Sequence, residues 1–378
     1  MTKIGMRNAW FQVHKWIGLL LAVAIIPISI TGALLVWHDP LDEWLNPQRV
    51  AEGAPALAAD RYAAAAAAAL APGERLMGLR LPEDGAVVAT AARPAQRGAG
   101  RPERTSLWLA PTDARVLDRA GSNSGLVRFM HVLHGSLFIP AWGRPIVGWI
   151  GVAMLLSSIS GLWLWWPTVG RWVRGLRWRR HRNIDTNLHH MMGFWIALPL
   201  FVLSLTGVWI SFPQFFAGLS GGGGEKAGPR EAGPTRQQRM RAQPLAQTAT
   251  PLSTALAAAT AERSGRIAQI GWPTDVEPAW TVGVDTGRGR PTEIKVDDAT
   301  GRATAAPREP REASGGVARL MRRLHDGTDM GIVWQVIIFL GGILPAILGI
   351  TGIVMWWRAR GWKSRLKARG RARLQPAE

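Results

Sequence analysis

Two histidines carry the spacing that most directly suggests chemistry. His14 and His189 open the stretches HKWIGLLLAVAIIPISITG and HHMMGFWIALPLFVLSLTG, and each lies four residues before one glycine and eighteen before another. Eighteen residues make five turns of α-helix, so each histidine shares a helix face with its two glycines. An apolar helix with an imidazole and two gaps on one face is a suitable place for a flat cofactor.

Two further histidines are related by an internal repeat. The segment ending at His134 aligns without a gap with the segment ending at His325, at an offset of 191 residues. The same offset aligns two pairs of dipeptides, Ser160-Gly161 with Thr351-Gly352 and Trp165-Trp166 with Trp356-Trp357. A repeat of this length predicts that the chain is an internal duplication. The remaining histidines have no equivalent in the repeat: His38, His131, His181 and His190.

Hydropathy predicts the elements that must hold these histidines. Four segments contain no charged residue: 16–37, 145–167, 191–213 and 330–357. Each is longer than the roughly 20 residues that cross a bilayer as a helix, so we expect four transmembrane helices. The first run is too long for a signal peptide and no small-residue cleavage site follows it, which favours a retained anchor.

The distribution of charge predicts the orientation of the helices. The net charge is +19, but 17 basic residues flank the apolar segments at the two termini and in the loop 168–187, with only two acidic residues beside them. By the positive-inside rule, both termini and this loop are cytoplasmic, and residues 38–123 and 214–313 lie outside, which is the periplasm if the protein is Gram-negative. The basic residues therefore indicate topology and not nucleic-acid binding. The chain has no cysteine, which excludes disulfides and thiolate ligands.

This topology pairs the histidines. His14 and His189 fall on the cytoplasmic side, and His134 and His325 on the outer side. Ionisable residues near the membrane interior are costly and usually functional, which favours ligands over structural histidines. Two imidazoles facing each other in a helical bundle are the ligand set of a b-type haem. We therefore expect two b-type haems, one on each pair.

Alternatives to this ligand set remain. Zinc or copper would require more protein ligands than two. His190 is adjacent to His189, and His131 precedes His134 by one helical turn, so either is a rival ligand on its side. Gly18 and Gly193 would let a macrocycle lie against the backbone, or would let helices pack closely.

The outside segments predict two small α+β modules with the same order of elements. The first contains a helix at 62–70, strands at 76–81 and 87–92, and a hairpin formed by 106–109 and 116–117. The second begins with a Gly/Pro-rich linker at 221–234 and continues with a helix at 252–262, strands at 267–271 and 279–284, and a hairpin from 293–296 through a turn at 297–301.

The full set of motifs resembles the PepSY-associated transmembrane family, which includes iron-regulated inner-membrane proteins and ferric siderophore reductases of the ferrioxamine type. The resemblance rests on HKWIGL…TGALLVWHDPLDEWLNP, LHGSL…SGLWLWWP, NLHHMMGFW…TGVWISF and RLHDG…TGIVMWW. It implies a mainly α-helical integral membrane protein with four transmembrane helices and two periplasmic PepSY-like modules. It also implies haem bound by helix histidines, which here correspond to His14, His134, His189 and His325.

The expected organisation follows the chain. Its segments are helix 1 (1–37), module 1 (38–123), an interfacial helix with helix 2 (124–167), a basic loop (168–187), helix 3 (188–213), a linker with module 2 (214–313), an interfacial helix with helix 4 (314–357) and a basic tail (358–378).

The expected function is reduction of a ferric siderophore at the periplasmic face by a di-haem protein of the inner membrane. The sequence contains no G-x-G-x-x-G after a strand, so a separate donor, a flavin reductase or quinol, supplies the electrons. Two other classes remain open: a siderophore or haem permease, and a haem-free PepSY-type protein that binds or regulates a partner.

Overall fold

The computed structural model describes residues 2–94, 103–121, 123–166, 172–178, 181–219, 236–287, 291–305 and 316–374. The chain forms two compact units. The helical unit comprises Met1–His38, Phe129–Glu225 and Arg311–Glu378, and the sheet unit comprises Asp39–Arg128 and Lys226–Pro310. The linker expected at 221–234 and part of the basic loop 168–187 lie outside the described residues.

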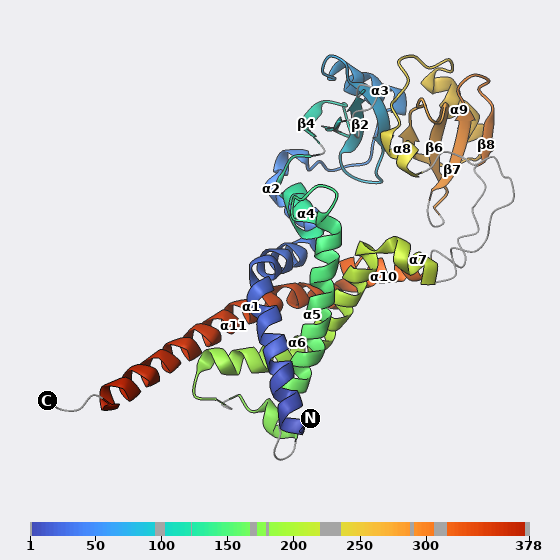
Figure 1. Cartoon of the computed structure of the whole chain (residues 1–378). Coiled ribbons are helices and arrows are strands. Elements are labelled where there is room, and N and C mark those ends of the chain that lie inside the picture. Colours follow the sequence, from blue (N-terminus) through green and yellow to red (C-terminus); the bar gives the residue numbers. More distant parts are fainter. Residues whose placement is uncertain are drawn as a thin grey trace. The chain divides into compact units, whose positions relative to one another are not determined.

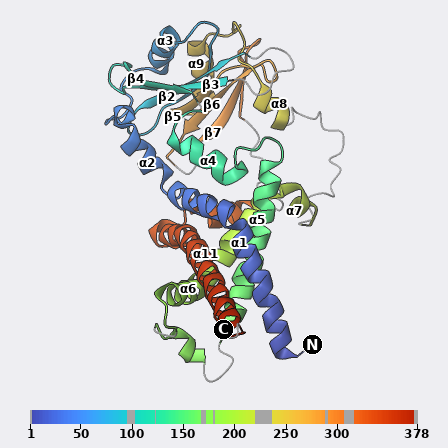
Figure 2. The same cartoon turned by 60° about the vertical axis from the view of Figure 1, so that its left-hand side comes forward.

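The helical unit is built on four long helices, shown in Figures 1 and 2. They are α1 (Lys3–Leu35), α5 (Gly143–Trp165), α6 (Ile184–Ser211) and α11 (Gly331–Leu374). In the described part of the chain these four helices are long and apolar enough to cross a membrane. The expectation of four such helices is confirmed, although α1 begins well before residue 16 and α11 continues well past residue 357.

Contacts between the helices define their order in the bundle. α1 packs against α5 and α11, and α6 packs against the same two helices. α1 and α6 therefore face each other diagonally. Arg7 from α1 donates to the carbonyl oxygens of Leu164 (2.5 Å) and Trp166 (3.0 Å), which places a positive charge at the C-terminal end of α5, where the helix dipole favours it. Arg358 of α11 pairs with Asp185 in the first turn of α6 at 2.6 Å.

Short helices precede two of the long ones. α4 (Leu126–Ser136) leads into α5 through a turn in which Leu137, Phe138 and Ala141 have positive φ. α10 (Gly316–Asp326) leads into α11 through Gly327 and Gly331, which also have positive φ. α2 (His38–Leu45) follows α1, and α7 (Pro213–Leu219) follows α6. These sharp turns let α4 and α10 bring residues back to the end of the bundle.

The sheet unit contains one antiparallel sheet of eight strands. Its order is β4-β3-β2-β1-β5-β6-β7-β8. The strands are β1 (Arg75–Arg80), β2 (Val87–Arg93), β3 (Glu103–Leu109), β4 (Val116–Gly121), β5 (Arg266–Gly271), β6 (Ala279–Asp285), β7 (Thr292–Asp297) and β8 (Ala303–Ala305). The accompanying helices are α3 (Ala59–Ala68), α9 (Leu252–Glu262) and the short α8 (Arg236–Arg241).

The sheet joins the two segments that the sequence treated as separate modules. β1 pairs with β5, and the residue opposite Leu79 is Ile270, its counterpart at the repeat offset of 191. Without this pairing each four-stranded half would present an unpaired inner edge, and such edges are prone to aggregation. The β1–β5 pairing removes both of these edges by joining the two small sheets into one sheet of eight strands.

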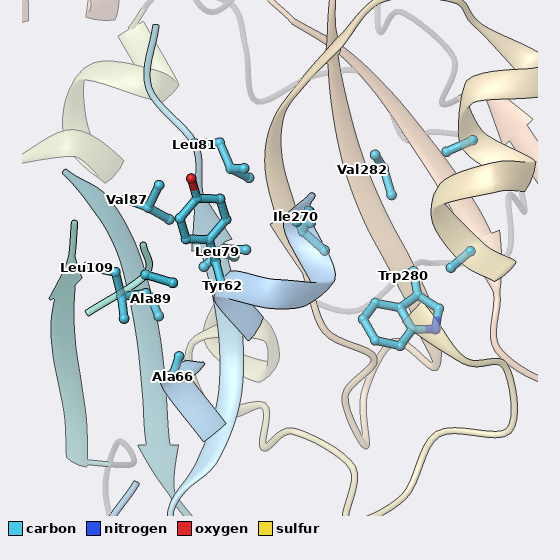
Figure 3. Packing of buried hydrophobic residues seen from close by; sticks show 14 of the residues in the cluster. Tyr62, Ala66, Leu79, Leu81, Val87, Ala89, Leu109, Ile270, Trp280 and Val282 are labelled. Atoms are coloured by element: carbon cyan, nitrogen blue, oxygen red, sulfur yellow. The ribbon is translucent and has the colours of Figure 1, made fainter. Parts of the chain in front are cut away.

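The core of this unit lies between the sheet and its helices (Figure 3). Tyr62 from α3 and Leu79 from β1 are buried on one half, and Trp280 and Val282 from β6 on the other. Burial alternates along β6, as expected for a strand with one face on the core.

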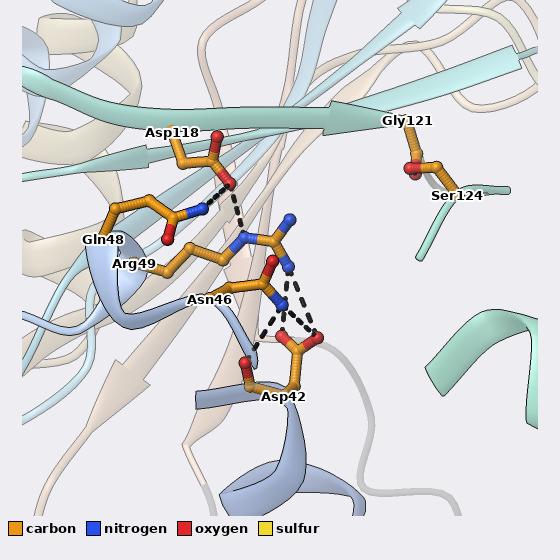
Figure 4. Close-up of polar contacts among 7 residues, drawn as sticks. All are labelled: Asp42, Asn46, Gln48, Arg49, Asp118, Gly121 and Ser124. Atoms are coloured by element: carbon orange, nitrogen blue, oxygen red, sulfur yellow. Dashed lines mark hydrogen bonds and ion pairs between the residues drawn. The ribbon is translucent and has the colours of Figure 1, made fainter. Parts of the chain in front are cut away.

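A polar network fastens the segment after α2 to the edge strand β4 (Figure 4). Nε of Arg49 lies 2.6 Å from Asp118, and its Nη1 lies 3.2 Å from Asp42. The same guanidinium group lies 4.1 Å from the ring centre of Trp108. Burial alone would raise the pKa of Asp118, but its hydrogen bonds and the charge of Arg49 outweigh burial and lower it. The network thus attaches this segment to β4, one of the two outer strands of the sheet.

Candidate functional site

The structure brings the four histidines of the repeat together in two pairs. The ring centres of His14 and His189 lie 6.5 Å apart, with an angle of 87° between the ring planes. Those of His134 and His325 lie 6.0 Å apart, at 45°. We call these the His14 pair and the His134 pair. Each joins residues from different halves of the chain, as the topology argument expected.

The two pairs differ in the elements that carry them. His14 and His189 lie on the diagonal helices α1 and α6, so their side chains meet in the interior of the bundle. From the sequence we expected His14 at the beginning of its helix. Because α1 starts at Lys3, His14 instead lies three turns inside the helix. His134 and His325 lie on the short helices α4 and α10.

The pairs are separated along the bundle. His134 contacts Gly32 of α1, eighteen residues after His14 on the same helix. At 1.5 Å per residue this corresponds to about 27 Å, close to the thickness of a hydrocarbon core. The two pairs are therefore two separate sites and not one cluster.

Each histidine ring lies over a glycine of a neighbouring long helix. A Cβ atom added to the glycine would meet Cε1 of the ring in every case. The distances are 2.5 Å for Gly32 and His134, 3.1 Å for Gly207 and His325, 3.2 Å for Gly161 and His14, and 3.6 Å for Gly352 and His189. Each glycine directly follows a serine or threonine in the sequence. We call this dipeptide, together with the helical turn that precedes it, the Ser/Thr-Gly seat of the ring.

The seat also fixes the ring through Nδ1. This atom lies 3.0 Å from Ser160 Oγ in His14, 2.9 Å from Thr351 Oγ1 in His189, 3.0 Å from Thr206 Oγ1 and 3.2 Å from the Leu203 carbonyl oxygen in His325, and 2.8 Å from the Ile28 carbonyl oxygen in His134. Ile28 and Leu203 precede the threonines of their seats by three residues, so all four rings meet the same part of the motif.

These contacts select one tautomer. A carbonyl oxygen only accepts, so the bond from His134 to Ile28 requires a proton on Nδ1. The hydroxyl of Thr351 donates to the Ile347 carbonyl oxygen at 2.9 Å, which leaves its oxygen to accept from His189. Ser160 and Thr206 donate to backbone carbonyls in the same way. In a neutral ring protonated at Nδ1, the lone pair is on Nε2, which is the arrangement of a metal-ligating histidine whose other nitrogen is held by a second partner.

The rings of the His134 pair are neutral at physiological pH. Burial, with a smaller contribution from the neighbouring His134, lowers the pKa of His325 from 6.5 to about 4. Burial also lowers the pKa of His134. Neutral imidazole is the form that binds a metal ion, so these residues do not require a proton to be displaced.

The geometry fits a group that brings its own metal and most of its ligands. Two imidazoles that bind one ion from opposite sides, with metal–nitrogen bonds of ~2 Å, have ring centres about 6 Å apart, and both pairs match this. The described residues contain no group of three or more His, Asp or Glu side chains that could hold a metal. A haem held by two imidazoles would fit this donor set.

The glycines of the opening stretch have roles that differ from the expectation. Gly32 and Gly207 do not share a cofactor gap with the histidine on their own helix, because the rings of His134 and His325 occupy their surfaces. Gly18 has no atom from another described part of the chain within 4 Å of an added Cβ, and Gly193 has only an ordinary contact. An added Cβ at Gly18 would therefore meet no other described part of the chain, whereas one at Gly193 would be in ordinary contact with Leu348 of α11.

The other histidines also form pairs. His190 lies against His181, with ring centres 4.6 Å apart, and His131 lies against His38, at 5.7 Å. The ring that meets His14 is that of His189, so the geometry favours His189 over the adjacent His190. In the same way, His134 and not His131 meets His325.

The repeat aligns the dipeptides of the seats, but their contact with the histidines was not predicted from the sequence. The available signal was that every histidine of the repeat has one Ser/Thr-Gly dipeptide in another helix, Thr31-Gly32, Ser160-Gly161, Thr206-Gly207 or Thr351-Gly352. A buried hydroxyl next to a glycine in an apolar helix is a natural partner for an imidazole from a neighbouring helix.

Comparison with known proteins supports the helices and motifs described above. No curated protein matches the chain. The family model for the PepSY-associated TM region matches residues 11–359. This range includes the apolar segments of all four long helices and both histidine pairs. The protein therefore belongs to the PepSY-associated TM region family.

Proposed function

We propose that this membrane protein is a di-haem electron-transfer protein that reduces ferric siderophores at the periplasmic face of a bacterial inner membrane. One observation carries the proposal. Two histidine pairs, about 27 Å apart along the bundle, each have the ring spacing and the Nδ1 hydrogen bonding of a bis-imidazole metal site.

The chain's own residues would hold and tune the haems. His14 and His189 would hold one haem, and His134 and His325 would hold the other. The seats would orient the rings and keep the proton on Nδ1, which makes Nε2 a stronger donor. Bound haem supplies reversible one-electron chemistry. Two sites along the bundle would divide the membrane crossing into shorter steps. This matters because the rate of electron transfer falls steeply with distance.

The direction of electron flow follows from charge. The basic residues beside the His14 pair favour a cytoplasmic location for it, with a flavin reductase or quinol as the donor. The His134 pair would then face the periplasm. Siderophores bind iron through hard oxygen ligands, which prefer Fe(III), so reduction releases Fe(II).

The first experiment is a visible spectrum of the purified protein in detergent, before and after dithionite. We expect a Soret band and a sharp low-spin α band on reduction, with about two haems per chain. His14→Ala and His134→Ala should each remove about half of the haem. His190→Ala should retain the full haem content. A wild-type protein without a Soret band, after expression with ample haem, contradicts the proposal and leaves a haem-free binding role.

The second experiment concerns the substrate. Dithionite-reduced protein, freed of excess reductant, should be reoxidised by a ferric siderophore with appearance of Fe(II). Reoxidation by gallium-loaded siderophore, which cannot accept an electron, should not occur. Uptake of intact labelled chelate into vesicles without any reductant would instead identify a permease.

A further inference from the structure

A third histidine pair lies at the same end of the bundle as the His134 pair. The ring centres of His38 and His131 are 5.7 Å apart, with 63° between their planes. Both residues belong to the helical unit. His38 is the first residue of α2, and His131 lies on α4. His131 precedes His134 by three residues on α4, so the two side chains lie on the same face of that helix.

Residues close in sequence to the two histidines make contacts within the helical unit. Trp37, adjacent to His38, donates from Nε1 to Gln335 Oε1 at 3.3 Å and packs on Phe339 with ring centres 4.9 Å apart. On α4, Phe129 packs against Phe138 across the turn, also at 4.9 Å. These aromatic contacts fix the chain within two residues of each imidazole. His131 is exposed and His38 half-buried, so an ion in water can reach the pair.

The pair at the opposite end provides a contrast. The ring centres of His181 and His190 are 4.6 Å apart, closer than those of His38 and His131, and the ring planes are tilted by 31°. Two imidazoles that share one ion at ~2 Å from each nitrogen have ring centres roughly 5 to 6 Å apart, depending on the angle at the metal. His38 and His131 meet this spacing and are inclined to each other.

We propose that His38 and His131 form a binding site for a divalent transition-metal ion. Imidazole nitrogen suits Fe(II), Zn(II) and related ions better than the hard Fe(III). With two protein ligands, the remaining positions go to water, so the ion exchanges readily. The binding itself is independent of haem. That the physiological ion is Fe(II), received beside the His134 pair after reduction, rests on the proposed function.

The test measures metal binding to the purified full-length protein with its affinity tag removed. Equilibrium dialysis against Zn(II), and against Fe(II) without oxygen, is read by elemental analysis for wild type, His38→Ala, His131→Ala and His190→Ala. We expect one exchangeable ion per wild-type chain. Affinity should fall by about 10- to 100-fold or more in the first two variants, because loss of a ligand costs at least as much as loss of its supporting partner. His190→Ala should bind like wild type.

Several outcomes would overturn the site: no exchangeable ion in wild type, equal affinity in all four proteins, or an equal loss in His190→Ala. His38→Asn and His131→Asn, with elution volume and haem spectrum measured in parallel, separate a lost ligand from misfolding. Reduced binding in the asparagine variants with an unchanged fold supports the site, and unchanged binding contradicts it. An ion bound in a wild type without haem would leave the site intact and contradict the proposed function. Haem without an exchangeable ion would contradict the metal site and leave the proposed function intact.

Discussion

The two histidine pairs use the same seat but depend on it in different ways. The His134 pair comes from short helices and is pressed closely onto Gly32 and Gly207, with 2.5 and 3.1 Å to an added Cβ. The His14 pair comes from long helices and lies 3.2 and 3.6 Å from an added Cβ at Gly161 and Gly352, so the contact at Gly32 is the one that is clearly closer than the others. A histidine on a long packed helix is placed by its backbone, whereas one on a short helix needs close contact with its neighbour. The following experiments test this difference.

The largest effect is expected for Gly32→Ala. The new Cβ would lie 2.5 Å from Cε1 and 2.8 Å from Nδ1 of His134, so the ring must leave its seat. We expect loss of about half of the bound haem, as for His134→Ala, measured as haem per protein after extraction. Gly18→Ala on the same helix is the matched control, because no other described part of the chain lies within 4 Å of its Cβ. Full haem content in Gly32→Ala would show that the close contact is dispensable.

The next effect concerns pH and the His134 pair in haem-free protein. His325 takes up a proton at a pKa of about 4 when folded and near 6.5 when unfolded, so the unfolded chain binds more protons between these values. The free energy of unfolding should therefore fall as pH drops below about 6.5, by ~2 kcal/mol from this group at pH 5. The measurement is the apparent melting temperature in detergent at pH 7.5, 6 and 5. His325→Gln does not titrate, so its melting temperature should fall less; an equal fall in both proteins argues against a buried neutral His325.

A smaller effect separates two buried threonines. The hydroxyl of Thr351 is the partner of His189 Nδ1, whereas the hydroxyl of Thr31 bonds to backbone carbonyls and His134 bonds directly to Ile28. Thr351→Val should weaken the ligand by removing a bond worth about 1 kcal/mol and raise one haem potential by about 40 mV. Thr31→Val should leave both potentials unchanged. Redox titration decides, and equal shifts would mean that the hydroxyls do not act through Nδ1.

The smallest effect is expected for Gly352→Ala. Its Cβ would lie 3.6 Å from Cε1 of His189, an ordinary contact distance. Haem content should therefore stay at the wild-type level in the same assay as for Gly32→Ala. A loss as large as that of Gly32→Ala would show that the two pairs depend on their glycines equally.

Much of the fold was accessible from local patterns. The helix expected at 252–262 is α9 with the same bounds, and the expected strands differ from β1, β2, β5 and β6 by one residue or so at each end. Periodicity and turn residues fix such elements locally. The pairing of β1 with β5 was not accessible, because it joins residues some 190 positions apart and leaves no local pattern.

For the candidate site too, the sequence predicted some features, and only the fold revealed the others. The internal repeat identified His14, His134, His189 and His325, and topology paired them. The seats required knowledge of which helices pack together, since Ser160 meets His14 from another helix. The pair of His38 and His131 has no counterpart in the repeat, and only the folded chain brings them together.

The central β1–β5 pairing has a consequence for synthesis of the protein. Ile270 leaves the ribosome some 190 residues after its partner Leu79. At about 5–20 residues per second, the first half waits roughly 10 to 40 s with β1 unpaired. During that time its exposed edge can join the same strand of another nascent chain. A shorter interval between synthesis of the two strands therefore shortens the time for which this edge is exposed to other chains.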